Sequence, residues 1–157
     1  MEAIAKHIML TEYPAIAPEA TIAEAISTFQ GFAGPESHRR VFGMMVTDDA
    51  GKLIGMISMY DILLLIRPKH IDLWGDMTDI DMTGLIDATC ERIKTVRVAD
   101  IMTTDVISTT PDTNIFVLLD MMIKKHIRRI PVVADEKIMG VVYLSDLFYY
   151  FHKWLIG

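Results

Sequence analysis

The chain has little cysteine and no long apolar run, and each shortage excludes a class of protein. Its 157 residues include one cysteine, Cys90, which excludes an internal disulfide and fits a reducing compartment. The longest uninterrupted apolar runs are about five or six residues, well below the roughly 20 that a membrane-spanning helix needs. Glu2 and Lys6 lie near the start with no long apolar block, so a signal peptide is not expected. We therefore expect a cytoplasmic protein that does not insert into a membrane.

Positive charge is also scarce, and this bears on partners and chemistry. Lys and Arg number 15 against 21 Asp and Glu, for a net charge of −6. That balance argues against nucleic acid as a partner, because binding to phosphate backbones draws on a basic surface. The five histidines show no metal-ligand spacing, Cys90 has no histidine and acid around it, and no Gly-x-x-x-x-Gly-Lys loop occurs. We expect neither an enzyme nor a metal site.

What the chain does contain is a repeat. The segment Gly55-Met56-Ile57-Ser58-Met59-Tyr60-Asp61 returns as Gly140-Val141-Val142-Tyr143-Leu144-Ser145-Asp146, 85 positions later (140 − 55 and 146 − 61). Each copy gives a glycine, a short apolar run typical of a buried strand, and a longer apolar run typical of a helix after the aspartate. The junction places Ser58 and Asp61 where backbone N–H groups lack intrahelical partners. A repeat indicates one structural unit used twice.

A second set of residues repeats at an offset of 93. His7-Ile8-Met9 aligns with Asp100-Ile101-Met102, and Pro18 and Ile22 align with Pro111 and Ile115. The offset falls to 85 because the first half has about six extra residues near 32–37 and about two in its hairpin. Apolar spacing predicts helices over 21–29, over 115–122 (capped by Thr113-Asn114), and after each repeated aspartate. Strands are predicted over 41–46, 53–57, 128–133 and 138–143.

These elements predict an α+β fold made of two similar halves. Each half has a short strand, a helix, a strand, a hairpin, a strand and a helix, which is a β-α-β-β-α unit. One such unit buries only one face of its sheet, so we expect two units packed sheet to sheet about a pseudo-two-fold axis. The predicted divisions are 1–68, an acidic connecting segment 69–97, and 98–157. A loose apolar stripe favours a helix in the connecting segment; a flexible linker is the alternative.

The ordered motifs of both halves resemble a known family. The second half is clearest, with Val98-Ala99-Asp100-Ile101-Met102-Thr103, Val106 to Asp112, Ile127 to Val133, and Gly140 to Asp146. It resembles the cystathionine-β-synthase (CBS) domain, and the chain resembles a stand-alone CBS pair, or Bateman module. The resemblance implies a non-catalytic regulatory protein that binds an adenine nucleotide (AMP, ADP or ATP) between its halves and requires no cofactor. It further implies a homodimer that forms through the helices after Asp61 and Asp146. An unknown effector protein would recognise the change in dimer packing.

The resemblance also implies which residues would hold the ligand. Asp61 and Asp146 occupy the position of the aspartate that binds the ribose hydroxyls. Ser58 occupies the Ser/Thr position of the first copy, while the second copy has Tyr143 there and Ser145 as a partial substitute. The short first strands and the second strands would bracket the adenine, and basic residues of the opposite copy would reach the phosphates. The bracketing candidates are Ala15, Ile16, Met45, Ser108, Thr109, Pro131 and Val132; the basic candidates are Arg39, Arg40, His126, Arg128 and Arg129.

Two alternatives to ligand binding remain open. Asp61 and Asp146 are also residues that cap helices, and Ser58 is also an ordinary turn residue. The first copy has Met44 where the family has proline, which places its cleft wall in doubt. Methionine fills irregular gaps, so Met44, Met45, Met56 and Met59 make a ligand-free structural or dimerisation module the alternative function.

Overall fold

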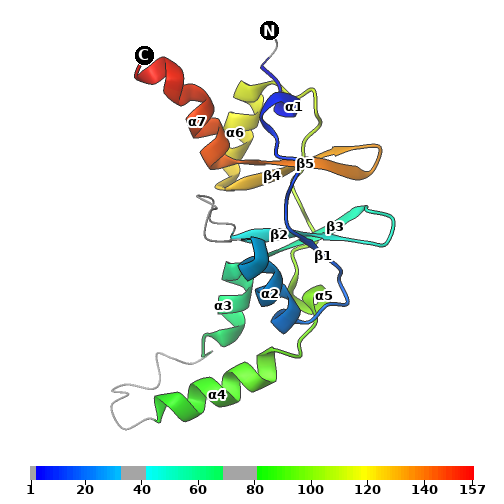
Figure 1. Cartoon of the computed structure of the whole chain (residues 1–157), viewed down its shortest axis with the longest axis vertical. Helices are drawn as coiled ribbons and strands as arrows, with labels where there is room; N and C mark the ends of the chain where they lie inside the picture. The colour runs from blue at the N-terminus through cyan, green and yellow to red at the C-terminus, as the bar shows by residue number, and fades with distance from the viewer. Residues whose placement is uncertain (1–2, 33–41, 69–80) are drawn as a thin grey trace. The chain divides into compact units, whose positions relative to one another are not determined.

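The computed structural model describes residues 3–32, 42–68 and 81–157 (Figure 1). Helices and strands are mixed along the chain, as the predicted α+β class requires, and the class is confirmed. In chain order the elements are α1 (Ala5–Ile8), β1 (Ala15–Ile16), α2 (Ile22–Phe32), β2 (Gly43–Thr47), β3 (Leu53–Ser58), α3 (Met59–Ile66), α4 (Met82–Ile93), α5 (Val98–Ile101), α6 (Ile115–Lys125), β4 (Arg129–Ala134), β5 (Lys137–Tyr143) and α7 (Leu144–Leu155).

Polar side chains fix the starts of the longer helices. Thr21 and Glu24 form a reciprocal pair at the start of α2: the Thr21 N–H donates to Glu24 Oε2 at 3.1 Å, and the Glu24 N–H donates to Thr21 Oγ1 at 3.2 Å. Asn114 caps α6, as predicted, by accepting from the Phe116 N–H at 2.8 Å. Helix α4 lies within the acidic connecting segment and begins after Asp81, whose carboxylate accepts from the Gly84 N–H at 3.2 Å.

The same strand arrangement occurs twice. In one sheet the order is β1-β2-β3, with β1 parallel to β2 and Ala15 paired with Met45. In the other sheet β4 and β5 are antiparallel, and Thr109 forms a parallel bridge to Val132 in the place that β1 takes in the first sheet. The predicted short first strand is therefore two residues long in one half and a single bridge in the other.

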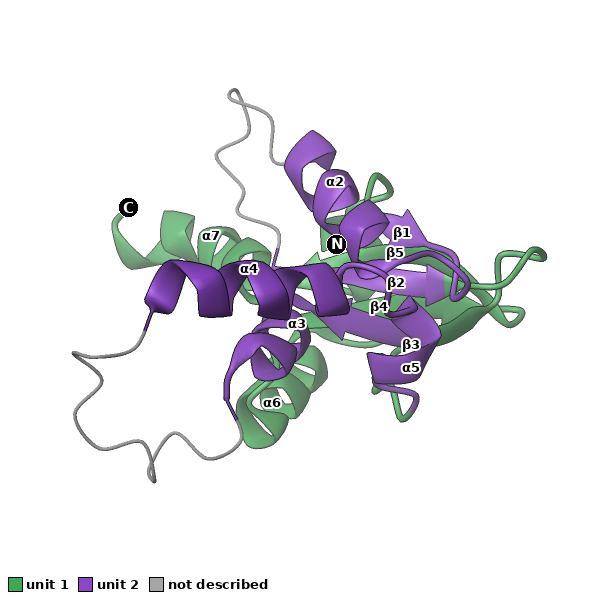
Figure 2. Ribbon diagram, turned by 90° about the horizontal axis from the view of Figure 1, so that it is seen from below, with its two compact units in different colours: residues 1–13, 47–54, 105–157 green, residues 14–46, 55–104 purple. Residues whose placement is uncertain are grey.

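The compact units in space do not follow the order of the repeats (Figure 2). Unit 1 comprises residues 1–13, 47–54 and 105–157, and unit 2 comprises residues 14–46 and 55–104. Thus the opening segment of each repeat lies in the unit formed mainly by the other repeat. Equivalent hydrogen bonds hold the two segments: the Ala5 N–H donates to Thr113 O at 2.8 Å in unit 1, and the Val98 N–H donates to Ala20 O at 2.8 Å in unit 2.

The repeated glycines lie where these opening segments cross the last strand of each unit. In unit 1, Leu10 and Val141 exchange two backbone hydrogen bonds of 2.9 Å, and a Cβ on Gly140 would lie 2.7 Å from Leu10 O. In unit 2, Met56 and Thr103 exchange the equivalent bonds, and a Cβ on Gly55 would lie 2.7 Å from Met102 Sδ. Space explains both glycines, because neither has a positive φ.

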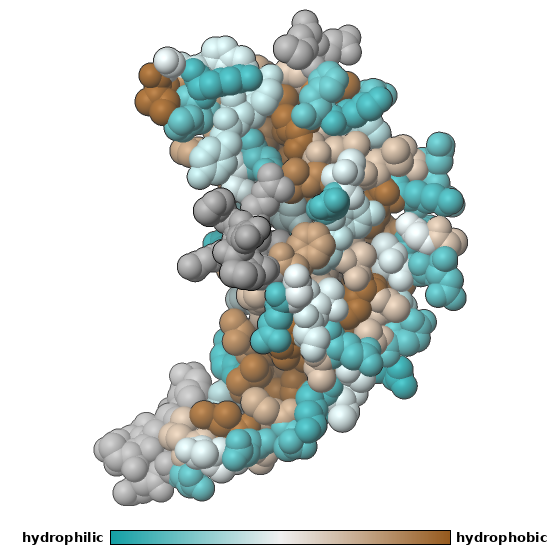
Figure 3. Space-filling view, in the orientation of Figure 1, coloured by the Kyte–Doolittle hydropathy of each residue, from teal (hydrophilic) through white to brown (hydrophobic). Residues whose placement is uncertain are grey.

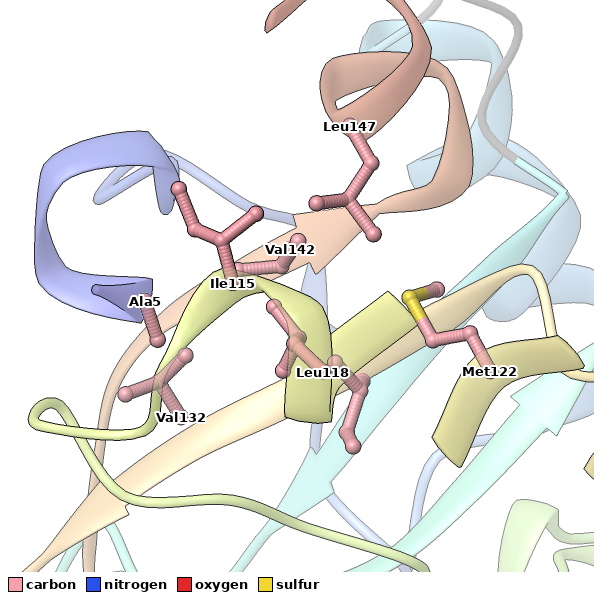
Figure 4. Close-up of a cluster of buried hydrophobic side chains, with 8 residues drawn as sticks. Ala5, Ile115, Leu118, Met122, Val132, Val142 and Leu147 are labelled. Atoms are coloured by element: carbon pink, nitrogen blue, oxygen red, sulfur yellow. The ribbon is translucent and has the colours of Figure 1, made fainter. Parts of the chain in front are cut away.

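Each unit has its own apolar interior. In unit 1 the buried cluster takes residues from α1, α6, α7 and both strands, and Figure 4 shows them converging around α6. Its members are Ala5, Ile115, Leu118, Met122, Ile130, Val132, Val142 and Leu147. In unit 2, α2 buries Ile22, Ala25 and Phe29, whereas Ile26, which the same apolar spacing places on the buried face, is 42% exposed.

Candidate functional site

A set of reciprocal polar contacts in unit 2 lies where β3 passes into α3. Asp61 Oδ2 accepts from the Ser58 N–H at 2.8 Å and from the Ser58 hydroxyl at 2.9 Å. In return, Ser58 Oγ accepts from the Asp61 N–H at 3.2 Å. The two residues therefore form a capping box, and α3 begins at Met59. The sequence predicted the helix after Asp61; it starts earlier because Ser58, not Asp61, is the N-cap.

Within the part of the chain that the structure describes, the cap uses only one of the two oxygens of the Asp61 carboxylate. An ionised carboxylate has about four lone-pair sites, and the two hydrogen bonds from Ser58 both fall on Oδ2. Among the described residues, no group donates to Asp61 Oδ1. Asp61 is half-buried, and the bonds that hold Oδ2 also orient Oδ1. A pair of adjacent hydroxyls is the type of donor that such an oxygen can accept.

The start of α3 has few backbone N–H groups left for a phosphate. The Met59 N–H donates to Phe42 O at 2.8 Å, and the Asp61 N–H is already bonded to Ser58 Oγ. Free N–H groups at a helix N-terminus are what make it an anion site. Two of the first three N–H groups of α3 are thus taken, and the junction is better suited to hydroxyl groups than to a phosphate.

The other candidates of unit 2 lie on neighbouring strands. Ala15 is exposed and Ile16 is half-buried on β1, and both are apolar. Met45 pairs with Ala15 but is 1% exposed. A side chain with almost no exposed surface contacts a ligand only after its neighbours move. Ala15 and Ile16 are therefore the accessible apolar candidates of this unit, and Met45 belongs to its interior.

The corresponding junction of unit 1 lies between β5 and α7. Asp146 is half-buried and its Oδ2 accepts from the Tyr143 N–H at 3.2 Å. Tyr143 is the N-cap residue of α7, so it takes the place that Ser58 takes in unit 2. Ser145 is exposed within the first turn of α7. The backbone geometry of the junction is thus repeated, but its serine hydroxyl is not.

The remaining candidates of unit 1 are partly committed to packing. Ser108 is exposed, whereas Thr109 is 7% exposed and its hydroxyl donates to Thr113 Oγ1 at 2.7 Å. Pro131 is buried, and Val132 is a member of the apolar cluster. Thr113 was expected only to cap α6, and its contact with Thr109 was not predicted. Thr113 Oγ1 also accepts from the Thr110 N–H at 3.3 Å. In the sequence, the only sign of these contacts is the presence of three threonines around Pro111-Asp112.

The basic candidates of unit 1 precede or begin β4. His126 ends α6 in the left-handed conformation (φ 53°) and is exposed, as is Arg128. Arg129 is half-buried at the first position of β4. Arg39 and Arg40 lie outside the described residues. The candidates are therefore divided between the units, with Ser58, Asp61, Ala15, Ile16 and Met45 in unit 2 and the other described ones in unit 1.

Two kinds of site are absent from the part of the chain that the structure describes. No group of three or more histidine, cysteine, aspartate or glutamate side chains there is placed to hold a metal ion. No helix within residues 3–32, 42–68 and 81–157 has the length and apolarity needed to cross a membrane. Burial raises the pKa of Tyr13, whose hydroxyl lies 3.5 Å from Ile138 O, but Tyr13 is not a junction residue.

Comparison with known proteins gives consistent results. A family model described as "CBS domain" matches residues 5–68 and 98–153. The uncharacterized protein MJ1426 of Methanocaldococcus jannaschii is 34% identical over 121 residues, which are 69% of this chain and 71% of that protein.

Two solved structures share the fold. The CBS domain pair of MJ0100, in complex with 5′-methylthioadenosine and S-adenosyl-L-methionine, has a TM-score of 0.68 and 21% identity, and the match covers 98% of each chain. The cytosolic domain of the Mg²⁺ channel MgtE, in complex with ATP, has a TM-score of 0.69 and 22% identity, and the match covers 96% of this chain and 49% of that one. At these identities the likeness is one of fold.

Proposed function

This chain belongs to the CBS domain family, and on that premise we propose that it is a regulatory module that binds an adenosine-containing ligand at Asp61. The observation that carries the proposal is the half-available carboxylate. Ser58 holds Oδ2 by two hydrogen bonds of 2.8 and 2.9 Å, so Oδ1 has a fixed direction before any ligand arrives. A pre-oriented acceptor loses little freedom on binding, which favours affinity.

The chemistry of the junction favours the ribose of such a ligand. Vicinal hydroxyls donate to a carboxylate through charge-assisted hydrogen bonds, which are stronger than neutral ones. Apolar Ala15 and Ile16 on β1 offer surface to a planar base. Two proteins of the same fold are described in complex with adenosine compounds, MJ0100 and MgtE. Their ligands support the choice of AMP, ADP, ATP, 5′-methylthioadenosine and S-adenosyl-L-methionine as the compounds to test.

We further propose that binding is transmitted through a homodimer to an effector protein. Helix α3 carries Asp61 at its start and exposed Leu63, Leu64 and Ile66 in the following turns. Figure 3 shows hydrophobic side chains gathered over α3. Helix α7 likewise exposes Phe148. Exposed apolar surface of this kind marks interaction sites, and a ligand that binds one packing arrangement more tightly shifts the dimer toward it.

Calorimetry on the full chain tests the ligand site directly. We expect Asp61→Asn to weaken binding of the tightest of the five compounds at least tenfold. Losing charge-assisted hydrogen bonds costs about 1.5–3 kcal/mol, and about 1.4 kcal/mol is a factor of ten. Asparagine keeps the shape and an acceptor for the Ser58 N–H, so the cap survives. Asp87→Asn, on the exposed surface of α4, is the matched control and should bind as the wild type does. Equal affinity of Asp61→Asn and the wild type would show that Asp61 does not bind the ligand.

A ligand-free structural module is the second candidate, and one observation favours it. Met44 and Met45 are 0% and 1% exposed, so methionines already fill space beside the strand that would line a ligand site. Thermal unfolding distinguishes the two functions. A ligand in excess over its dissociation constant raises the melting temperature, and no change with any of the five compounds would favour the structural module.

A further inference from the structure

The two junctions have the same backbone design but different side chains at one position, and this difference has a functional consequence. Ser58 and Tyr143 are 85 residues apart (143 − 58), and each is the N-cap of the helix that follows. We propose that each chain takes one adenosine-type ligand, at the Ser58–Asp61 junction, and that Tyr143 prevents the Asp146 junction from taking a second. This inference rests on the proposed function and specifies its stoichiometry.

Ser58 holds its aspartate through its hydroxyl as well as through its backbone. Asp61 Oδ2 accepts two hydrogen bonds from Ser58, and the shorter is 2.8 Å. At the other junction, the backbone bond from the Tyr143 N–H to Asp146 Oδ2 is 3.2 Å. Tyrosine has no hydroxyl at Cβ from which to donate as Ser58 does. The Ser58 hydroxyl is thus a positioning group for Asp61 that has no serine counterpart at the Asp146 junction.

The two N-cap side chains also differ in size. Serine places one oxygen beyond Cβ, whereas tyrosine places a ring and a hydroxyl there. Tyr143 is half-buried, and burial of an aromatic side chain stabilises the position that it holds. A ligand at the Asp146 junction must therefore be accommodated beside a much larger N-cap side chain than a ligand at the Ser58–Asp61 junction.

The strands that would face the base differ as well. In unit 2 the first strand offers apolar Ala15 and Ile16. In unit 1 the candidates are polar: Ser108 is exposed, and Thr109 is 7% exposed with its hydroxyl bonded to Thr113 Oγ1 at 2.7 Å. A base that packed here would gain little apolar surface. All three differences act in the same direction, so the two junctions differ in ligand binding although their backbones repeat.

Native mass spectrometry and equilibrium dialysis of the full chain measure the number of ligands bound. The probes are AMP, ADP, ATP, 5′-methylthioadenosine and S-adenosyl-L-methionine, each at a concentration that only just saturates the wild type. We expect one molecule per chain for the wild type and for Asp146→Asn, and well under one for Asp61→Asn, because its affinity is at least tenfold weaker. Tyr143→Ser introduces the hydroxyl and removes the ring, and should raise the count to two. Tyr143→Phe keeps the ring and should stay at one.

The outcomes separate this inference from the function it rests on. Two ligands per wild-type chain, or a single site lost in Asp146→Asn but kept in Asp61→Asn, would overturn the inference and leave ligand binding standing. A folded Tyr143→Ser that stays at one would refute the role of Tyr143. If Tyr143→Ser does not fold, the two aspartate variants still identify the occupied junction. Failure of every probe to bind the wild type would overturn the proposed function itself.

Discussion

Replacing the repeated glycines by alanine should destabilise the two units unequally. A Cβ at position 140 would lie 2.7 Å from Leu10 O and 2.9 Å from Met9 Cγ. A carbon and a carbonyl oxygen settle at about 3.3–3.6 Å, so the two must separate by about 0.6 Å or more. The obstacle is a backbone atom held by the paired Leu10–Val141 hydrogen bonds of 2.9 Å. Relief therefore stretches the bridge between the opening segment and β5.

The size of the effect follows from these contacts. Overpacking costs about 1–3 kcal/mol, and weakening one or two backbone hydrogen bonds adds about 0.5–1.5 kcal/mol each. The entropy that alanine removes from the unfolded chain offsets about 0.4–1 kcal/mol. We expect Gly140→Ala to lower the free energy of unfolding by about 2–4 kcal/mol, or about 5–15 °C in melting temperature for a chain of this size.

The equivalent change in unit 2 should cost less. A Cβ at position 55 would meet Met102 Sδ at 2.7 Å and Thr103 O at 3.0 Å. The sulfur is near the end of a flexible side chain that adapts to its surroundings, so only the carbonyl contact is stiff. We expect Gly55→Ala to cost less than about 1.5 kcal/mol, the lower part of the overpacking range.

Urea unfolding followed by circular dichroism measures both variants against one control. Gly31→Ala is suitable because Gly31 lies in α2 and a Cβ added to it would have no atom within 4 Å; it should stabilise the protein by about 0.5–1 kcal/mol. If Gly140→Ala were as stable as the wild type, or less costly than Gly55→Ala, the explanation of the repeated glycines by close approach would be refuted.

Two further predictions concern the ligand and the dimer. Ser58→Ala should weaken ligand binding and lower the free energy of unfolding by about 1 kcal/mol, because the cap is lost. The wild type should bind a 2′-deoxy analogue at least tenfold more weakly than the ribose compound, and Asp61→Asn should lose this preference. Calorimetry with both ligands measures the two affinities, and an equal preference in both proteins would contradict a ribose contact. Leu63→Glu and Phe148→Glu should each shift the mass measured by light scattering from dimer to monomer, because burying an unpaired charge in the interface is costly. Asp87→Asn is the control and should leave the mass unchanged. A wild type that is already a monomer would contradict the proposed dimer.

The local elements were predictable from sequence because their causes are local. The start of α6 follows from Asn114, whose side chain reaches the Phe116 N–H two residues on. The buried face of α2 follows from residues three and four apart. The repeat of Gly55 and Gly140 marked two equivalent strands, and the structure explains the spacing by two equivalent close approaches.

The assignment of segments to units was not predictable in the same way. Ala5 bonds to Thr113, and Val98 bonds to Ala20, so each opening segment pairs with residues far away in the chain. Periodicity describes which face of an element is apolar, but not which distant element covers it. Helices α1 and α5 were missed for a related reason, since four residues are too few to show a helical period.

For the candidate site, the sequence identified the residues but presented cap and ligand site as alternatives. The structure shows why they are compatible at Asp61. The cap uses Oδ2 and the Asp61 N–H, while no described group donates to Oδ1. Capping therefore contributes to the proposed binding by fixing the direction of Oδ1, and a variant that keeps the cap but removes the charge, Asp61→Asn, separates the two roles. Tyr143 shows the reverse case, because the backbone cap bond to Asp146 persists at 3.2 Å where the serine hydroxyl is absent.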